Sequence, residues 1–155
     1  FPRYLQLSSI NRQFLPILAS QMVGCVAGIV SVVFIAKLFG SSDAVIMSLA
    51  SKSVTTPIAM EVTQVLGGIP SLTAAIVVVT GLLGAIIGFK TLSVGHVHNP
   101  MALGLSMGAA SHAIGTSVAM DHDRFVGAYA SLGLTLNGIL TALLAPTVVD
   151  IVNGF

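Results

Sequence analysis

The sequence predicts an all-α transmembrane protein, a multi-span helical bundle with two broken or re-entrant half-helix segments that are related by an internal repeat. The residues are 55% hydrophobic with a mean hydropathy of +1.00. Only 7% of them are charged, against roughly 25% in an ordinary soluble domain. Several long runs carry no charge, and two further segments are apolar at their ends but polar in their middles. We expect a single membrane domain over residues 1–155 whose main solvent is the lipid bilayer.

The composition also excludes several classes of function. Six Lys and Arg against five Asp and Glu give a formal charge of +1, which is too small and too scattered for a nucleic-acid partner. Cys25 is the only cysteine, so the chain has no disulfide framework and no CxxC pair. We expect neither enzymatic activity nor a cofactor.

Three uncharged runs predict full membrane spans: residues 14–36, 71–89 and 125–149. At a rise of about 1.5 Å per residue, each is long enough to cross a hydrocarbon core of about 30 Å. In the first run, Gly24 and Gly28 form a GxxxG pair that would let another helix approach closely. The chain opens at Phe1 with neither an apolar signal region nor a small-residue cleavage site, which leads us to expect an N-terminal truncation.

Two segments between these runs, residues 42–66 and 100–126, do not read as continuous transmembrane helices. In the first, residues 51–56 form a polar break between apolar pieces. Thr56 and Pro57 then match the N-cap and first position of a helix, because proline at that position costs no hydrogen bond. We therefore expect a half-helix to begin there.

The two broken segments resemble each other. Without gaps, SKSVTTPIAME at residues 51–61 aligns with SHAIGTSVAMD at residues 111–121. The acidic position repeats as Glu61 and Asp121, and the cationic position as Lys52 and His112. The alignment predicts repeat units of about 42–89 and 100–152. The alternative is that membrane segments rich in small residues resemble one another by chance.

If both segments are re-entrant hairpins, the single span between them makes them enter from opposite faces of the membrane. Their tips would then meet near the midplane, where transporters with inverted repeats bind substrate. The alternative is two full crossings. The hairpin arrangement puts one group of basic residues on one side and Lys37 on the other, whereas full crossings would move Lys90 across. That first group is Arg3, Arg12, Lys90 and Arg124.

Among the charged residues of the broken segments, Lys52, Glu61 and Asp121 stand out. At a helix centre in the membrane each would cost about 2.5–3.5 kcal/mol, so a membrane protein keeps such residues for a reason. Glu61 lies one turn beyond Pro57, and Asp121 is its counterpart, so we assign both to the coupling of an ion or proton to substrate entry. The alternative is that the two acids lie near headgroups and that Lys52 snorkels.

The helix starts predict a binding site for a carboxylate. Thr56 and Thr116 would each cap a half-helix whose free N–H groups and positive dipole end attract an anion. Lys52 and His112 precede these caps at the same spacing and would add cationic donors. The predicted substrate-binding residues are Lys52, Ser53, Thr55, Thr56, Ser111, His112, Gly115 and Thr116.

Two other patterns are better explained without chemistry. The residues 104–108 fit GxSxG, but a nucleophile elbow needs a strand before it and both flanks here are helical, so we expect no catalytic residue. Asp121, His122 and Asp123 with His96 and His98 offer suitable donors for a divalent metal. Their spacing does not support a site, and an acidic cap beside a loop histidine pair explains them, so we expect no metal.

The stretches 51–88 and 101–121, with the signatures SVTTPIAME and ASHAIGT, resemble the LrgB/CidB/YohK family. The resemblance extends over about residues 45–146. Members of this family carry further hydrophobic helices upstream, so it also implies that N-terminal helices are missing from this chain. The signatures fall on residues 53–61 and 110–116 as motif matches, without roles for single residues.

The resemblance implies a multi-pass protein of the bacterial inner, or plasma, membrane, or of the chloroplast envelope in a plant. Bacterial members work beside a small LrgA-like membrane partner and were first described as holin-like or antiholin-like regulators of murein hydrolase activity and cell lysis. The plant relative is the plastidal glycolate/glycerate translocator, and some bacterial members are implicated in pyruvate uptake.

The first functional hypothesis is therefore a transporter or facilitator of small monocarboxylates such as glycolate, glycerate or pyruvate. The alternative is a holin-like or antiholin-like protein that regulates murein hydrolase activity and cell lysis. A pore should carry a polar stripe along full-length helices, whereas this sequence concentrates its polarity in two breaks. A third class is a subunit that stabilises a partner or a homo-oligomer through GxxxG spans, which does not account for Lys52 and Glu61.

Overall fold

The computed structural model describes the backbone of residues 3–154 and the side chains of residues 13–154, and this part of the chain is helical without any strand. The side chains of Arg3 and Arg12, used above in the charge argument, lie outside the described residues. The all-α prediction is confirmed. The helices are α1 (Arg3–Leu38), α2 (Asp43–Leu49), α3 (Thr56–Leu66), α4 (Pro70–Val94), α5 (Pro100–His122) and α6 (Arg124–Asn153).

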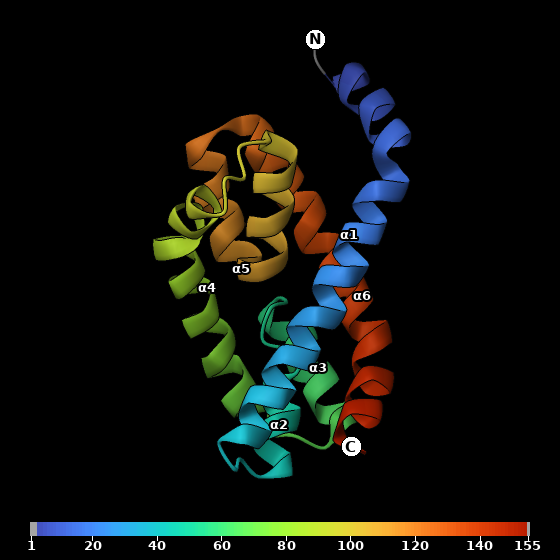
Figure 1. Cartoon of the computed structure of the whole chain (residues 1–155), viewed down its shortest axis with the longest axis vertical. Helices are drawn as coiled ribbons and strands as arrows, with labels where there is room; N and C mark the ends of the chain where they lie inside the picture. The colour runs from blue at the N-terminus through green and yellow to red at the C-terminus, as the bar shows by residue number, and fades with distance from the viewer. Residues whose placement is uncertain (1–2, 155) are drawn as a thin grey trace.

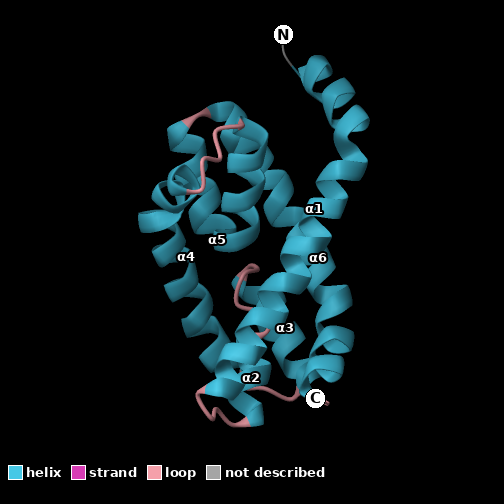
Figure 2. Cartoon of the chain, viewed as in Figure 1, coloured by secondary structure: helices cyan, strands magenta, loops and turns pink. Residues whose placement is uncertain are grey.

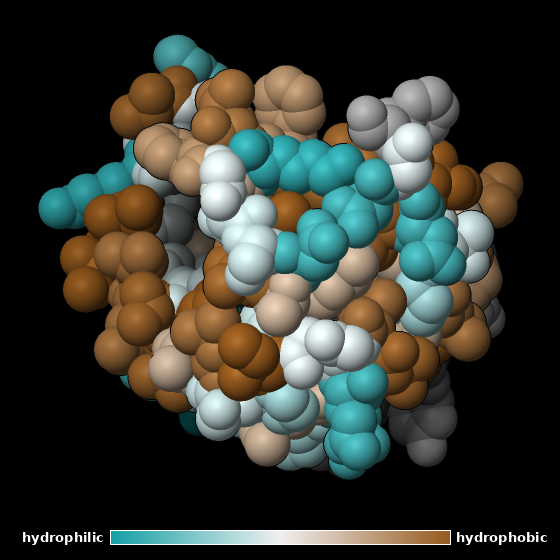
Figure 3. All heavy atoms as spheres, turned by 90° about the horizontal axis from the view of Figure 1, so that it is seen from below, coloured by the Kyte–Doolittle hydropathy of each residue, from teal (hydrophilic) through white to brown (hydrophobic). Residues whose placement is uncertain are grey.

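Three helices are long and apolar enough to cross a membrane: Gln13–Leu38 in α1, Pro70–Val94 in α4, and Arg124–Asn153 in α6. They contain the three predicted spans. Large apolar side chains face outward along them, among them Val23 at 70% exposure and Ile86 at 68%. Seen from one end, a hydrophilic patch crosses the middle of the molecule, and most of its left side is hydrophobic (Figure 3). This distribution fits a bundle whose flanks meet lipid and whose ends meet water.

The first broken segment is a hairpin. Helix α2 and helix α3 lie at the same end of the bundle, and the loop between them reaches into the middle of the molecule (Figures 1 and 2). The N-cap of α3 is Thr55 in extended conformation, with no side-chain cap hydrogen bond. The predicted cap at Thr56 is therefore corrected by one residue, because Thr56 already has helical geometry and Pro57 takes a first-turn position.

The second broken segment is also a hairpin, although its two arms read as one helix, α5. Ser111 and His112 have non-helical dihedral angles inside it. A Cβ added to Gly104 would meet Val126, and one added to Gly127 would meet Met120. Residues 104 and 120 of α5 therefore lie beside the same part of α6, which requires the chain to reverse between them.

Thr116 is not a helix cap, contrary to the prediction. The second arm of α5 begins just after His112, so Thr116 lies a turn inside the arm, and its hydroxyl donates to the His112 carbonyl at 2.8 Å. A threonine on a formed helical turn satisfies its hydroxyl by this back-bond to the preceding turn.

The two hairpins enter from opposite ends of the bundle and their tips meet in its middle (Figure 1). Val54 at the first tip shares an apolar cluster with Val77 of α4. His112 at the second tip makes a hydrogen bond of 2.8 Å from Nε2 to the carbonyl of the same Val77. Lys90 and Arg124 lie towards one end and Lys37 towards the other, as the hairpin arrangement predicts. The internal repeat itself stays a prediction.

The first hairpin is fixed to α4 by buried hydroxyl groups. Thr63 Oγ1 lies 3.0 Å from Ser51 Oγ and 2.8 Å from Thr73 Oγ1. Thr73 also donates to the Ser48 carbonyl at 2.9 Å. Each hydroxyl has a partner inside the bundle, so these groups can be buried without an unpaired donor or acceptor. They hold α2, α3 and the start of α4 as one unit.

Close helix packing fixes the second hairpin to α6. A Cβ on Gly108 would collide with the backbone of Ala130. Only glycine allows the two backbones to approach so closely. Gly104 and Gly108, the two glycines of the GxSxG match, therefore serve the contact between α5 and α6.

Candidate functional site

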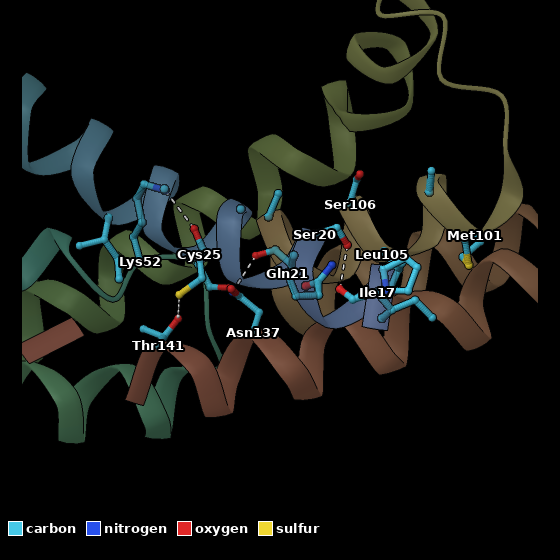
Figure 4. Close-up of a pocket in the computed structure, with 18 of the residues that line it drawn as sticks. Ile17, Ser20, Gln21, Cys25, Lys52, Met101, Leu105, Ser106, Asn137 and Thr141 are labelled. Atoms are coloured by element: carbon cyan, nitrogen blue, oxygen red, sulfur yellow. Dashed lines mark hydrogen bonds between the residues drawn. The ribbon is translucent and has the colours of Figure 1, made fainter. Parts of the chain in front are cut away.

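A cavity of about 590 Å³ opens between α1, the tip of the first hairpin, the first arm of α5 and the middle of α6. Most of its wall is apolar. Its polar groups come from four separate elements and converge on one region (Figure 4). They are Ser20 and Gln21 of α1, Lys52 and Ser53 of the first tip, Ser106 of α5, and Asn137 and Thr141 of α6. A mostly apolar cavity with a few convergent polar groups is the common form of a small-molecule site.

Lys52 is the cation of this cavity. Among the described residues that line it, none is Asp or Glu. The side chain is half-buried, and Nζ donates a hydrogen bond of 3.0 Å to Ser53 Oγ. An ammonium that is held in an apolar wall without a carboxylate attracts an anion more strongly than it would in water. The site is therefore suited to a negatively charged ligand.

Asn137 ties the two hairpin tips together at the cavity wall. Its Nδ2 donates to the Ser53 carbonyl at 3.3 Å and to the Ala109 carbonyl at 2.9 Å. Ser53 lies in the first tip and Ala109 just before the second. The side chain is only 3% exposed, so both bonds form in a region with little competing water.

Gln21 faces the same cavity from α1 and is 4% exposed. Its Oε1 atom has no hydrogen-bond partner, alone among the buried side-chain nitrogen and oxygen atoms of the described residues. A buried carbonyl oxygen without a donor is rare in native structures and calls for a specific explanation.

Gly24 and Gly28 line the cavity as well. A Cβ at either position would meet nothing within 4 Å. The predicted GxxxG pair therefore faces open space, and no helix among the described residues packs closely on it. Its neighbour Cys25 is buried and lies 3.4 Å from Thr141 Oγ1 through its sulfur atom.

The structure brings only part of the predicted substrate site together. Lys52 and Ser53 line the cavity, whereas Thr55 and Thr56 do not. The four predicted residues of the second segment also lie off the lining, because they pack within α5 and against α4. They are Ser111, His112, Gly115 and Thr116.

Gly84 and Gly115 show how tightly that second group is packed. A Cβ on Gly84 of α4 would collide with Ser111, and one on Gly115 would collide with Ser111 from the other arm of α5. The hydroxyl of Ser111 is therefore enclosed by helix packing, and the second tip contributes backbone to the site through Ala109 rather than side chains.

The predicted coupling residues lie outside the cavity lining. Glu61 is exposed on the outer side of α3, between Ile58 at 37% and Val65 at 76% exposure. Asp121 is exposed near the end of α5. The described residues contain no group of three or more His, Cys, Asp or Glu side chains placed to hold a metal ion.

Gln21 and Asn137 were missed by the sequence reasoning. Each lies in a long uncharged run that was treated as a uniform span. A signal was present, because each is the only amide side chain in its run. An amide inside a membrane span needs a partner in the protein or in a ligand.

The chain matches the family model described as the LrgB-like family over residues 1–151. It is 41% identical to an uncharacterized protein of Haemophilus influenzae, covering 99% of this chain and 67% of that protein. It is 34% identical to the uncharacterized protein YxaC of Bacillus subtilis and to the holin-like protein CidB of Staphylococcus aureus, in each case over 96% of this chain and 65% of the relative. The chain thus spans about two thirds of the length of these relatives. No solved structure matches it.

Proposed function

This chain belongs to the LrgB-like family, and we propose that it is a membrane transporter or facilitator of small monocarboxylates of the glycolate, glycerate or pyruvate type. The observation that carries this proposal is the position of Lys52, a cation in a largely apolar cavity at the meeting point of two opposed hairpins. Such a cavity near the middle of a membrane bundle is where a transported solute would bind. The family and the apolar helices make the chain a multi-pass membrane protein.

The ligand carboxylate binds at Lys52 and Ser53 in this proposal. Lys52 supplies the charge, and Ser53 Oγ, which already accepts from Nζ, keeps the ammonium at the cavity wall. The cradle first predicted at Thr56 and Thr116 is not part of the proposal, because neither lines the cavity. A hydrogen bond between an ammonium and a carboxylate is worth about 1.5–3 kcal/mol.

The test is uptake of labelled glycolate, glycerate and pyruvate into proteoliposomes that contain the protein. Lys52→Gln removes the charge and keeps length and polarity. The substitution should lower the affinity for glycolate tenfold or more, because it removes a charge-assisted hydrogen bond of about 1.5–3 kcal/mol. It should lower the affinity for the neutral analogue glycolamide far less. The matched control is Lys90→Gln, since Lys90 is exposed on α4 away from the cavity. Equal weakening of glycolate and glycolamide, in a variant that folds normally, would remove Lys52 from the site.

The second candidate function is a holin-like or antiholin-like role in regulating murein hydrolase activity and cell lysis. The printed names of several Staphylococcus relatives, "Holin-like protein CidB", favour it, and they favour it more directly than they favour transport. A lesion that passes large solutes should release a trapped fluorescent dye from the proteoliposomes. Dye release without saturable uptake of the acids would support this second candidate and oppose the first.

The remaining parts of the proposal concern location and partners. We place the protein in the inner, or plasma, membrane, with an LrgA-like small membrane protein or a second copy of the chain as its partner. Copurification from solubilised membranes and the mass of the purified complex would test both.

A further inference from the structure

The unpaired Oε1 atom of Gln21 is the feature that the proposed function leaves unexplained. The side chain is 4% exposed and lines the cavity from α1, while Lys52 lines it from the tip of the first hairpin (Figure 4). A carbonyl oxygen removed from water without a donor is costly to keep. A ligand that supplies the missing donor would account for such a group on the wall of a cavity.

The neighbouring polar groups do not supply it. Ser20 Oγ donates to the Ile17 carbonyl of its own helix at 2.8 Å. Asn137 Nδ2 is engaged by two backbone carbonyls, and the Cys25 thiol pairs with the Thr141 hydroxyl. These polar groups of the cavity therefore already have other hydrogen-bond partners, and none of them donates to Gln21 Oε1.

We propose that Gln21 is a specificity-determining residue: its Oε1 is enclosed in the ligand-free protein, and on binding the amide turns toward the cavity so that Oε1 accepts a hydrogen bond from a hydroxyl group of the carboxylate ligand held at Lys52. This inference rests on the proposed function and selects among its substrates. The preferred ligand is a short hydroxy acid, which carries an anionic group for Lys52 and a donor for Gln21. A keto acid presents a second carbonyl oxygen to Oε1, and two acceptors repel each other. An unsubstituted acid leaves Oε1 unpaired.

The energetic reason for strong selection is burial. A site that must hydrogen-bond a ligand hydroxyl discriminates against analogues without it, because the protein group is then left unpaired away from water. The discrimination does not depend on ligand size. Lactate, pyruvate and propionate have the same carbon skeleton and differ at one carbon, where they carry a hydroxyl, a keto oxygen and no oxygen respectively.

The experiment measures equilibrium binding of labelled lactate, pyruvate and propionate to the purified protein in lipid nanodiscs. The parent protein should bind lactate about tenfold more tightly than either analogue. Gln21→Met keeps the length of the side chain and removes the amide, so lactate binding should fall to the level of propionate while propionate binding stays unchanged. The matched control is Ser31→Ala, which removes from α1 a hydroxyl that lies outside the cavity lining and bonds to the Gly28 carbonyl of its own helix, and which should preserve the preference for lactate.

A second measurement separates recognition from folding. Because Gln21→Met removes an unpaired buried acceptor, the ligand-free variant should melt at the same temperature as the parent or higher. A merely structural amide would instead lower the melting temperature and weaken all three ligands together.

The possible failures are distinguishable. If all three acids bind equally and their binding requires Lys52, the proposed function stands and the role of Gln21 is overturned. If Gln21→Met weakens all three alike, the role of Gln21 is likewise overturned. If none binds, or if binding ignores Lys52→Gln, the proposed function fails and the inference fails with it.

Discussion

Asn137 joins the two hairpin tips in the centre of the molecule. Its Nδ2 group is the donor for carbonyls in both hairpins, at Ser53 and Ala109. Asn137→Asp keeps the shape of the side chain and replaces this donor with a carboxylate oxygen that faces two acceptors. Leaving buried carbonyls unpaired costs about 1–3 kcal/mol, so we expect a loss of stability of at least that size in a thermal-shift assay of the solubilised protein.

The control for this prediction is Asn99→Asp. Asn99 caps α5 by accepting from the N–H groups of Met101 and Ala102 through Oδ1. Aspartate keeps that acceptor and places a negative charge at a helix start, which is neutral or favourable. If the two substitutions had the same effect on stability, the donor role of Asn137 would be wrong.

His112 has an unusual backbone conformation. At this position we expect glycine to be more stable than alanine, which is the reverse of the usual order in a helix. The φ of His112 is 41°, a left-handed region that costs an L-residue about 1–2 kcal/mol and costs glycine little. Both His112→Ala and His112→Gly remove the bond from Nε2 to Val77, but only glycine relieves the backbone. We expect the glycine variant to be more stable than the alanine variant by about 1 kcal/mol.

The neighbouring Ala113 supplies the comparison, because it is exposed and starts the second arm of α5. There Ala113→Gly should follow the ordinary helical order and cost about 0.5–1 kcal/mol. The unfolding midpoints of the three variants test this prediction. If His112→Ala were more stable than His112→Gly, the backbone at position 112 would not be strained.

The sequence alone predicts those residues of the candidate site whose type is unusual for a membrane segment. It does not predict the other residues of the site. Lys52 stands out because a charge in a membrane segment needs a reason, and the structure places it in the cavity. His112 stands out equally, but its ring forms a hydrogen bond with the Val77 carbonyl and does not line the cavity. Which face of a long helix turns inward depends on packing with other helices, so the sequence alone could not bring Gln21 and Asn137 to the same wall.

At the scale of elements, the hairpin shape of the first broken segment can be tested by labelling. Ser42 precedes α2, Ile69 precedes α4 and is 43% exposed, and both lie at the same end of the bundle. Single cysteines at these two positions, in a Cys25→Ser background, should react with a membrane-impermeant thiol reagent from the same side.

His98 provides the opposite reference, since it is exposed in the loop after α4. A cysteine at that position should react from the other side of the membrane. If the cysteines at Ser42 and Ile69 reacted from opposite sides, the segment between them would cross the membrane fully and the hairpin would be wrong. Gly68 is a poor site for this test, because a Cβ there would lie 2.9 Å from the Ser48 backbone nitrogen.

The two hairpins also show where element prediction succeeds. The break of the first is marked by polar residues followed by Pro57, and the helix starts within one residue of the expected position. The break of the second has no such mark. Its turn occurs at Ser111 and His112, before the expected cap at Thr116. His112 combines a positive φ with a hydrogen bond to α4, and neither feature leaves a mark in the composition of the segment.

At the scale of the whole molecule, Glu61 and Asp121 lie outside the cavity yet on the hairpins that form it. We expect them to govern coupling more than affinity. Glu61→Gln should flatten the dependence of transport on pH or sodium while leaving the binding constant for glycolate nearly unchanged. Uptake rates across a pH series and a sodium series, compared with equilibrium binding of the same acid, measure the two separately.

Gln64→Glu is a useful counterpart, because Gln64 is exposed one turn further along α3 and the substitution adds the charge that the other variant removes. Gln64→Glu should leave the dependence of transport on pH and sodium unchanged. A Glu61→Gln variant with an unchanged pH and sodium dependence but no binding would show that Glu61 belongs to the binding site instead.

The double attachment of Asn137 has a thermodynamic consequence for the two ends of the molecule. A hairpin that withdraws from the centre breaks its bond to Asn137 and leaves the other hairpin's bond as the only constraint on that side chain. Under the proposed transport function, we therefore expect the free energies of opening at the two ends to be linked, by at most the worth of one hydrogen bond, about 0.5–1.5 kcal/mol. Linkage is reciprocal, so whatever stabilises one end in its open form changes the opening of the other by the same factor. If the protein transports a solute as proposed, binding of that solute from one end would bias opening at the far end without direct contact there.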